Sequence, residues 1–411
     1  PPPPPPPPPP PSPTPPPPPP PPTIRSSSAA SDVYKRQELG FTSKRDIEAH
    51  GMAAFVRRCK ERVLRMAALQ TLQSIRLGMW MHWDDPETLR WLADNIDRHE
   101  PVTVDTPGGP LTGTVEQVVG LLGHKPWHGS YFTFSDENNF LIWHFLKTCH
   151  ERGWIYQGTD VMPWCARCGT GLSQHEIATE GYQETTHLSP TVRFPLVDRP
   201  GESLLVWTTT PWTLTSNVAA AVGPELTYVQ VRQNGETLYL AEGAARSALQ
   251  GEYEVTGRHK GTEMLGWRYE GPFDELPAQV ETRDLHAVIA WVEVGEEEGT
   301  GIVHIAPGCG AEDFVLGKEL GLPAIAPLNE DGHFVDGFDW LVGRHALAVA
   351  DEVLNNLHDK ERLYHAESYT HRYPVCWRCQ SELVFRLVDE WYISMGELYD
   401  KPRAEVTAEE K

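Results

Sequence analysis

Hydrophobic residues recur at helical spacing in two stretches of the first half of the chain. The first stretch follows Ser43, which together with Asp46 resembles a capping box, and it continues to Trp80. In the second stretch, which follows Ser135, one helical face collects the apolar residues Leu141, Ile142, Phe145, Leu146 and Cys149 before Gly153. The pattern predicts helices over residues 43–80 and 135–153. Residues 84–130 are less regular and contain proline and glycine clusters, which indicates a small inserted subdomain.

The pattern changes to short β-rich segments after His175. The predicted strands are Leu204 to Trp207, Tyr228 to Val231, Leu238 to Leu240, Val288 to Val294 and Ile302 to Ile305. Asn234-Gly235 separates two of them and is typical of a type I′ hairpin turn. A helical pattern returns over residues 346–357. The sequence therefore predicts a strand-rich module of roughly 180 residues inside a more helical frame.

The beginning of the chain has a different composition. Residues 1–22 are all proline except Ser12 and Thr14, and residues 23–37 show no periodicity. Such a tract cannot bury apolar side chains, so we expect residues 1–37 to be disordered. A homopolymer of cytosine encodes polyproline, and we therefore interpret residues 1–37 as a translated artefact. A natural proline-rich tail is the alternative.

Charge and hydropathy exclude several function classes. Among the 411 residues, 35 are Lys or Arg and 57 are Asp or Glu, which gives a formal net charge of −22. A general DNA-binding protein would need a cationic face, so we expect no DNA partner, although a local basic cleft stays possible. The sequence contains no run of 18 apolar residues and no secretory signal pattern. We expect a cytoplasmic protein without a membrane partner.

Four of the seven cysteines form two Cys-X-X-Cys pairs, Cys165 with Cys168 and Cys376 with Cys379. Two-residue spacing lets both thiolates of a pair reach one ion, and two pairs complete a tetrahedral thiolate site. The pairs bracket the strand-rich module, as expected if they join the chain where an insertion leaves and returns. We predict a structural zinc ion, the alternative being four buried or free thiols. A catalytic zinc is not expected, because four cysteines leave no open coordination position.

Two further motifs carry hydroxyl, imidazole and carboxyl groups. In WTTTPWTL, which begins at Trp207, Pro211 ends a strand directly after three threonines and leaves their hydroxyls at an edge. In GTGIVHIAPGCGAED, a strand carries His304 into a proline- and glycine-rich loop, and Asp313 follows at the start of a predicted helix. Taken singly, the threonines are typical of a strand end, His304 of a core histidine and Asp313 of a helix cap.

Together these motifs resemble the class I aminoacyl-tRNA synthetases for branched aliphatic amino acids. The resemblance covers residues 38–411 and rests on ELGFTSKRDIEAHG, SDENN, VMPWCARCGTGLSQHE, WTTTPWTLTSN, GTGIVHIAPGCGAEDF and DEWYISMGELYDKPR. His304 in its VHIAPG context favours the isoleucine-specific branch, the isoleucyl-tRNA synthetases. The valine- and leucine-specific branches share the threonine-rich peptide and the aspartate.

The resemblance implies a fold and a division into domains. We expect an α/β protein in which a partial Rossmann-type class I core is interrupted by a β-rich editing insertion. The implied boundaries are residues 38–185 for the partial catalytic core, connective helices and first zinc knuckle, and residues 186–365 for the editing domain. Residues 366–411 would hold the second zinc knuckle and the return to the truncated core.

The resemblance also implies an activity and its residues. Members of this family attach the amino acid to tRNA and hydrolyse mischarged products in the insertion, because one missing methylene changes binding by only about 1–3 kcal/mol. Asp313 would pair with the α-ammonium group, His304 would limit side-chain size, and hydroxyls would position the terminal adenosine and the water. With no obvious nucleophile, we expect direct attack by water. The implied catalytic residues are Thr208, Thr209, Thr210 and Asp313, and the implied substrate-binding residues are Trp207, Asn217 and His304.

Two family motifs are missing from the sequence. Neither the His-Ile-Gly-His-like tetrapeptide nor the Lys-Met-Ser-Lys-Ser-like loop that binds ATP is present, and no Walker A pattern replaces them. We therefore expect an internal fragment that cannot form aminoacyl-adenylate, with ATP and Mg²⁺ bound only by the full-length enzyme. The implied partners are the acceptor end of tRNA-Ile, isoleucine and valine, and we expect a monomer. The alternatives are a stand-alone trans-editing deacylase and an inactive zinc-stabilised tRNA-binding module.

Overall fold

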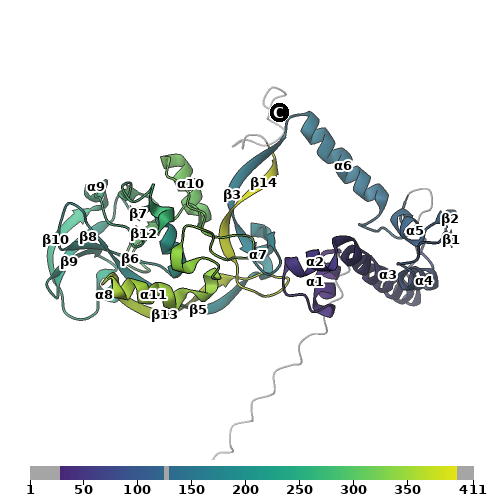
Figure 1. The fold of residues 1–411 in the computed structure, drawn as a ribbon, viewed down its shortest axis with the longest axis horizontal. Coiled ribbons are helices and arrows are strands. Elements are labelled where there is room, and N and C mark those ends of the chain that lie inside the picture. Colours follow the sequence, from purple (N-terminus) through teal and green to yellow (C-terminus); the bar gives the residue numbers. More distant parts are fainter. Residues whose placement is uncertain (1–27, 125–128, 396–411) are drawn as a thin grey trace, which may run out of the picture. The chain divides into compact units, whose positions relative to one another are not determined.

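The computed structural model describes residues 28–124 and 129–395 (Figure 1). Within these ranges the chain forms two compact units. The first comprises residues 28–35 and 53–139, and the second comprises residues 36–52 and 140–395. In the described part of the chain no helix combines the length and the apolar character needed to cross a membrane.

The first unit is mainly helical and contains the small subdomain that the sequence predicts over residues 84–130. A hairpin of two short strands lies among its helices. Its elements are α1 (Ser28–Glu38), α3 (Met52–Arg76), α4 (Pro86–Asp94), β1 (Val102–Thr106), β2 (Gly109–Gly113) and α5 (Val115–Leu121). Leu64, Leu92, Leu111 and Val118 are buried in one apolar cluster, which joins all of these elements except α1. This unit therefore has a core of its own.

Helix α1 corrects the expectation for the beginning of the chain. The prediction of a tract without structure over residues 1–37 is wrong for residues 28–37, which are helical; residues 1–27 lie outside the described residues. The guanidinium of Arg62 lies 4.3 Å from the centre of the Tyr34 ring. In addition, Arg36 donates a hydrogen bond to the carbonyl oxygen of Cys168 at 3.2 Å. Tertiary contacts of this kind stabilise a short helix that has no hydrophobic periodicity.

The helical predictions for residues 43–80 and 135–153 are confirmed with shifted boundaries. The first stretch forms α2 (Lys44–His50) and α3, because the backbone turns at Gly51, where φ is 97°. The Asp46 carboxylate accepts the Ser43 N–H at 2.8 Å, as expected for the capping position. In the second stretch, α6 (Asp136–Glu151) begins where the Ser135 hydroxyl accepts the Asn138 N–H at 3.3 Å. Of the predicted apolar face of α6, only Cys149 is buried.

The second unit is built on a nine-stranded sheet, which confirms the strand-rich module. Seven strands follow the order β10-β8-β9-β6-β12-β7-β11, and β5 joins β6 and β13 at the side of this path. The strands are β5 (Tyr182–Pro195), β6 (Glu202–Trp207), β7 (Ala219–Val222), β8 (Thr227–Gln233), β9 (Glu236–Ala241), β10 (Glu254–Lys260), β11 (Val288–Ala290), β12 (Ile302–Ile305) and β13 (Leu363–Pro374).

Short helices and turns connect these strands. Asn234 and Gly235 both have positive φ (51° and 90°), which confirms the type I′ turn between β8 and β9. The predicted strand at residues 288–294 is wrong after Ala290, because the chain turns there. The helical elements are η1 (Pro211–Ser216), α8 (Ala245–Ala248), α9 (Gly261–Met264), η2 (Pro277–Gln279), α10 (Ala311–Leu320), η3 (Asp339–Leu341), η4 (Ala346–Ala348) and α11 (Ala350–Asp359).

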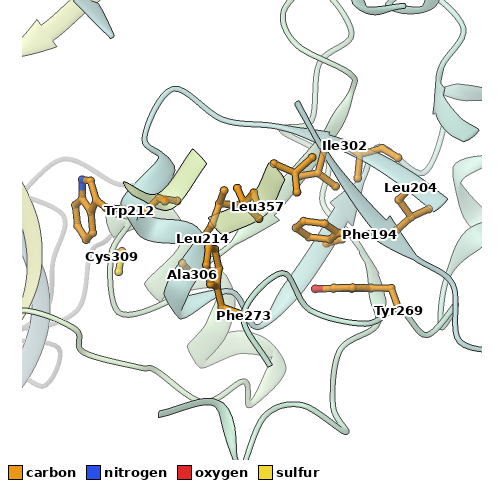
Figure 2. Packing of buried hydrophobic residues seen from close by; sticks show 14 of the residues in the cluster. Phe194, Leu204, Trp212, Leu214, Tyr269, Phe273, Ile302, Ala306, Cys309 and Leu357 are labelled. Carbon is orange, nitrogen blue, oxygen red and sulfur yellow. The ribbon is translucent and has the colours of Figure 1, made fainter. Parts of the chain in front are cut away.

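The main core of this unit is packed against the sheet (Figure 2). The rings of Phe194 on β5 and Tyr269 stack with their centres 5.0 Å apart. Leu204 of β6, Ile302 of β12 and Leu357 of α11 belong to the same buried cluster. Burial of these side chains fixes the ends of β6 and β12, from which the site residues project.

Two antiparallel ribbons meet at the cysteine pairs. One consists of β5 and β13, whose pairing extends from Tyr182 with Pro374 to Val192 with Leu363. The other consists of β3 (Ile155–Cys165) and β14 (Val384–Ile393), which run side by side in Figure 1. The two-residue strand β4 (Thr170–Gly171) and helix α7 (Gln174–Glu180) lie between β3 and β5. The chain thus enters and leaves the module through strands that are paired with each other.

Candidate active site and metal centre

A cavity of about 670 Å³ lies beside the ends of β6 and β12, next to the start of α10. It brings together residues that are about 100 positions apart in the sequence. Of the seven predicted substrate-site residues, six line it: Trp207, Thr208, Thr209, Thr210, His304 and Asp313. The structure therefore gathers both predicted motifs at a single concave site.

The three threonines occupy the turn between β6 and η1. The Thr208 hydroxyl accepts the Thr210 N–H at 3.1 Å, and the hydroxyl oxygens of Thr209 and Thr210 are 3.3 Å apart. Pro211 then begins η1, as expected for a residue with a fixed φ and no N–H to donate. These contacts hold hydroxyl groups at the cavity edge, where they can bind water or a ribose.

His304 is held by Thr213, a residue that the sequence analysis did not single out. His304 Nε2 lies 2.9 Å from the Thr213 hydroxyl, which itself donates to the carbonyl oxygen of Thr210 at 2.7 Å. Burial lowers the pKa of His304 to about 4, so the imidazole is neutral near pH 7. Thr213 lies three residues after Thr210, and this spacing within a proline-initiated turn is the sequence signal that could have found it.

Asp313 lies in the first turn of α10, and its side chain lines the cavity. Its carboxylate accepts the Ala306 N–H at 2.8 Å. Burial raises the pKa of Asp313 to about 6, and the nearby Glu312 acts in the same direction. A partly dry carboxylate in this position is suited to bind a cation.

Asn217 and Trp207 differ in their access to the cavity. The Asn217 side chain is fully buried; it accepts the Tyr269 hydroxyl at 2.8 Å and donates to the carbonyl oxygen of Ala219 at 3.0 Å. Asn217 does not line the cavity, so direct substrate binding by this residue is not supported and its contacts hold η1 against the core. Trp207 does line it, with its ring edge-on to Tyr369 at 5.1 Å.

The cavity lining is acidic. Besides Asp313, the side chains of Glu297, Glu298 and Glu312 contribute to it, whereas none of the described lining residues is Lys or Arg. Cys309 also lines the cavity, but burial raises the pKa of its thiol, so it is protonated near neutral pH. The site thus favours a cationic guest and offers water as the attacking group.

Gly308 is a sensitive point in the loop that holds Asp313. A Cβ at this position would overlap the backbone carbonyl of Ile325. We expect Gly308→Ala to shift the 306–310 loop, to lower the melting temperature by several degrees and to weaken any activity that depends on Asp313. Thermal melts of Gly308→Ala and of Gly295→Ala, whose Cβ would meet no atom within 4 Å and whose backbone is outside the left-handed region, test this. Equal melting temperatures for the chain and Gly308→Ala would contradict it.

The two cysteine pairs form a compact cluster between the ribbons. The sulfur atoms of Cys165, Cys168, Cys376 and Cys379 all lie within 4.8 Å of one another. A tetrahedral zinc site with bonds of about 2.3 Å places its sulfur atoms about 3.8 Å apart. Four thiols at this spacing fit a metal ion, and the structure thereby confirms that the two pairs form one site.

The two pairs adopt the same local turn. In each, the residue after the second cysteine donates its N–H to the carbonyl of the first, at 2.8 Å for Gly169 and 2.7 Å for Gln380. Both residues have φ near 60°. Hydrogen bonds among the four thiols lower the pKa values of Cys376 and Cys379 and raise those of Cys165 and Cys168. Two of the four sulfur atoms are thus favoured as the thiolates that a metal requires.

The chain matches a protein family over most of its length. The model of the class I tRNA synthetases (I, L, M and V) matches residues 112–410. The chain belongs to this family of class I tRNA synthetases, and the match confirms the predicted fold class, an α/β synthetase core with a β-rich editing insertion.

Its curated relatives are isoleucine–tRNA ligases. The chain is 36% identical over 383 residues to that of Thermobifida fusca, with 91% of this chain and 31% of the relative covered. It is 34% identical over 366 residues to that of Clostridium novyi, with coverages of 89% and 30%. The chain therefore spans less than one third of the length of these relatives.

Solved structures resemble parts of the fold at low sequence identity. The crystal structure of GlLeuRS-CP1 aligns with a TM-score of 0.36 and 13% identity, covering 44% of this chain and 99% of that one. The editing domain of the cytosolic leucyl-tRNA synthetase from P. knowlesi aligns with a TM-score of 0.27 and 12% identity, covering 34% of this chain and 64% of that one.

Proposed function

We propose that this chain is the part of an isoleucine–tRNA ligase that hydrolyses valine wrongly attached to tRNA-Ile. The observation that carries the proposal is the cavity. The neutral imidazole of His304, the buried carboxylate of Asp313 and three consecutive threonines line it together. The acidic lining suits an aminoacyl ester, because the ester presents a cationic α-ammonium next to the carbonyl that is attacked.

Each residue has a defined role in this proposal. Asp313 binds the α-ammonium and thereby fixes the position of the carbonyl. The hydroxyls of Thr208, Thr209 and Thr210 position the terminal ribose and the attacking water. His304 limits the length of the side chain that fits, so valine is accepted and isoleucine is excluded. Water attacks the ester carbonyl carbon, the bond to the ribose oxygen breaks, and that oxygen leaves with a proton.

The partners and the cofactor follow from the same proposal. The tRNA partner is tRNA-Ile, which enters by its acceptor end, and the amino acids are valine and isoleucine. Zinc occupies the cysteine cluster and holds the two ribbons together. The chain acts as a monomer in the cytoplasm, and ATP and Mg²⁺ act in the full-length enzyme, outside this chain. The domain boundaries are those stated above, with the editing domain at residues 186–365.

The central experiment compares two charged tRNAs. The chain is incubated with valyl-tRNA-Ile and with isoleucyl-tRNA-Ile, and release of the amino acid is followed against a protein-free blank. We expect the valyl ester to be hydrolysed and the isoleucyl ester to be spared. No hydrolysis above the blank would favour a tRNA-binding module without activity.

Shortening His304 tests the size limit. His304→Ala enlarges the cavity, so hydrolysis of isoleucyl-tRNA-Ile should rise by at least about tenfold, the effect of admitting one methylene. His333→Ala is the matched control, because His333 belongs to the same unit but does not line the cavity. Unchanged sparing of the isoleucyl ester by a folded His304→Ala protein would contradict the size-limiting role.

A further inference from the structure

One buried polar residue outside the cavity lining, Gln279 of η2, is bonded to the end of η1. Gln279 is 1% exposed. Its Nε2 donates to the carbonyl oxygen of Thr215 at 2.8 Å and to that of Asn217 at 3.2 Å. The Thr282 hydroxyl contacts Oε1 of the same amide, which leaves Nε2 for the two carbonyls. A buried amide costs stability unless its hydrogen bonds are made, and here those bonds join η2 to η1.

The stretch of chain that Gln279 binds also holds His304 at two points. The Thr213 hydroxyl lies 2.9 Å from His304 Nε2 and fixes the ring. Ala220 of β7 pairs with His304 of β12 and fixes its backbone. The two carbonyls that Gln279 binds lie between these two contacts in the sequence. The ring and the backbone of His304 are therefore both held by residues 213–220, and Gln279 binds the middle of that stretch.

We propose that Gln279 is a positioning residue for the cavity: by fixing the end of η1 it sets the position of His304, and with it the discrimination between valyl and isoleucyl esters. This inference rests on the proposed function, in which His304 limits the length of the side chain that fits. The two esters differ by one methylene, so a small displacement of the His304 ring is enough to change the ratio of their rates. Gln279 itself does not line the cavity and acts only through the stretch that it binds.

Gln233 provides a control with the same chemistry at another place in the fold. It is 3% exposed, and its Nε2 donates to the carbonyl oxygens of Gln250 at 2.9 Å and of Glu252 at 3.3 Å. Its Oε1 accepts the Tyr364 hydroxyl at 2.8 Å. Gln233 lies in β8 and does not line the cavity. Replacement of either glutamine therefore removes the same kinds of hydrogen bond, but only the bonds of Gln279 reach η1.

The experiment measures kcat/KM for valyl-tRNA-Ile and isoleucyl-tRNA-Ile in the unmodified chain, in Gln279→Met and in Gln233→Met. Each rate is corrected for protein-free hydrolysis. Methionine keeps the unbranched shape of glutamine and cannot donate a hydrogen bond. We expect the valyl-to-isoleucyl ratio to fall at least about threefold in Gln279→Met, as for one buried hydrogen bond lost. Gln233→Met should keep the ratio of the unmodified chain, and both variants should melt at a lower temperature than that chain.

The outcomes separate this inference from the proposed function. An unchanged ratio in a folded Gln279→Met protein overturns the inference and leaves the proposed function intact, because valyl-tRNA-Ile is still hydrolysed. An equal fall of the ratio in Gln233→Met also overturns the inference, since the ratio then reports a general loosening of the fold. Hydrolysis of neither ester by the unmodified chain overturns the proposed function, and this inference with it.

A milder variant decides if Gln279→Met does not fold, as judged by its thermal melt. Thr282→Val removes the hydroxyl that contacts Oε1 and keeps the Gln279 side chain. The orientation of the amide is then less fixed, so the valyl-to-isoleucyl ratio should fall at least about twofold. The ratio of the unmodified chain in a folded Thr282→Val protein would overturn the inference.

Discussion

Removal of the Asp313 carboxyl group is expected to abolish hydrolysis of valyl-tRNA-Ile, with a fall in kcat/KM of at least about 100-fold in Asp313→Ala. Asp313 is the most buried of the four carboxyl residues that line the cavity, and this burial raises its pKa to about 6. Without it the ester can enter, but its ammonium group is no longer bound and the carbonyl is no longer held against the water. Deacylation rates of the chain and of Asp313→Ala measure the effect.

Asp313→Asn separates this role from a structural one. The Asn side chain can still accept the Ala306 N–H that Asp313 accepts at 2.8 Å, so the 306–310 loop stays fastened. Asp313→Ala loses that bond, which costs about 1 kcal/mol of stability. We therefore expect both variants to lose activity and only Asp313→Ala to lose stability. An active Asp313→Asn protein would contradict the electrostatic role. Asp313 would then have only a structural role, holding the 306–310 loop through its hydrogen bond from the Ala306 N–H.

The raised pKa of Asp313 gives the pH dependence a definite sign. The folded state binds the Asp313 proton more tightly than the unfolded state, so the ionised carboxylate reduces stability above about pH 6 and this effect is absent below about pH 4. At pH 7.5, Asp313→Asn should melt at the same temperature as the chain or higher. Activity has the opposite dependence: background-corrected kcat/KM should rise from pH 5 to pH 7 in the chain and stay flat in Asp313→Asn.

The candidate site could be predicted from the sequence because its residues are carried by two continuous motifs. Thr208 to Thr210 stand directly before a proline, and His304 and Asp313 flank a glycine-rich loop. The motifs could not predict how these residues pack in three dimensions. Asn217 lies within the first motif, yet its amide is used by Tyr269 and Ala219 in the core. Nε1 of Trp212 and Nδ1 of His304 have no hydrogen-bond partner among the described residues, which likewise emerges only from the packing.

Other parts of the fold lack a local signal. The strands β5 and β13 form a two-stranded ribbon over much of their length, and over Tyr182–Thr186 and Glu367–Arg372 most side chains are exposed, on both faces. Alternation of apolar and polar residues arises only when one face is buried, so neither strand was predicted. The same reason applies to β3 and β14. Helix α1 was missed because its sequence shows no hydrophobic periodicity.

In α6 the sequence signal was clear, but the face that it predicted to be buried is exposed. Leu141, Ile142 and Phe145 gave a clear helical pattern, and the helix is present, yet these side chains are 49–62% exposed. Hydrophobic periodicity identifies a helix face that is suited to burial, whether or not another element covers it. The helix itself is stabilised by its backbone hydrogen bonds and by the Ser135 cap. The pattern therefore predicted the element correctly and did not predict what packs against it.

The second large effect is expected at the cysteine cluster. We expect one zinc ion per chain, and Cys376→Ser should lose it and lower the melting temperature by about 10 °C. The reason lies in the topology: β5 is paired with β13 and β3 with β14, and the cluster is where the two ribbons meet. Without the metal, four thiols that are mostly buried have only weak hydrogen bonds between them.

Metal analysis by mass spectrometry and thermal melts measure both effects. Cys59→Ser is the matched control, because Cys59 lies in α3, outside the cluster. Acid or a chelator should release the metal from the unmodified chain, since protonation of the thiolates competes with binding. The cavity is lined mainly by residues around β6, β12 and α10, with only Tyr373 and Phe385 from the ribbons, so Cys376→Ser should reduce deacylation less than Asp313→Ala does. Unchanged metal content in Cys376→Ser, or the same loss in Cys59→Ser, would show that these four cysteines do not hold the ion.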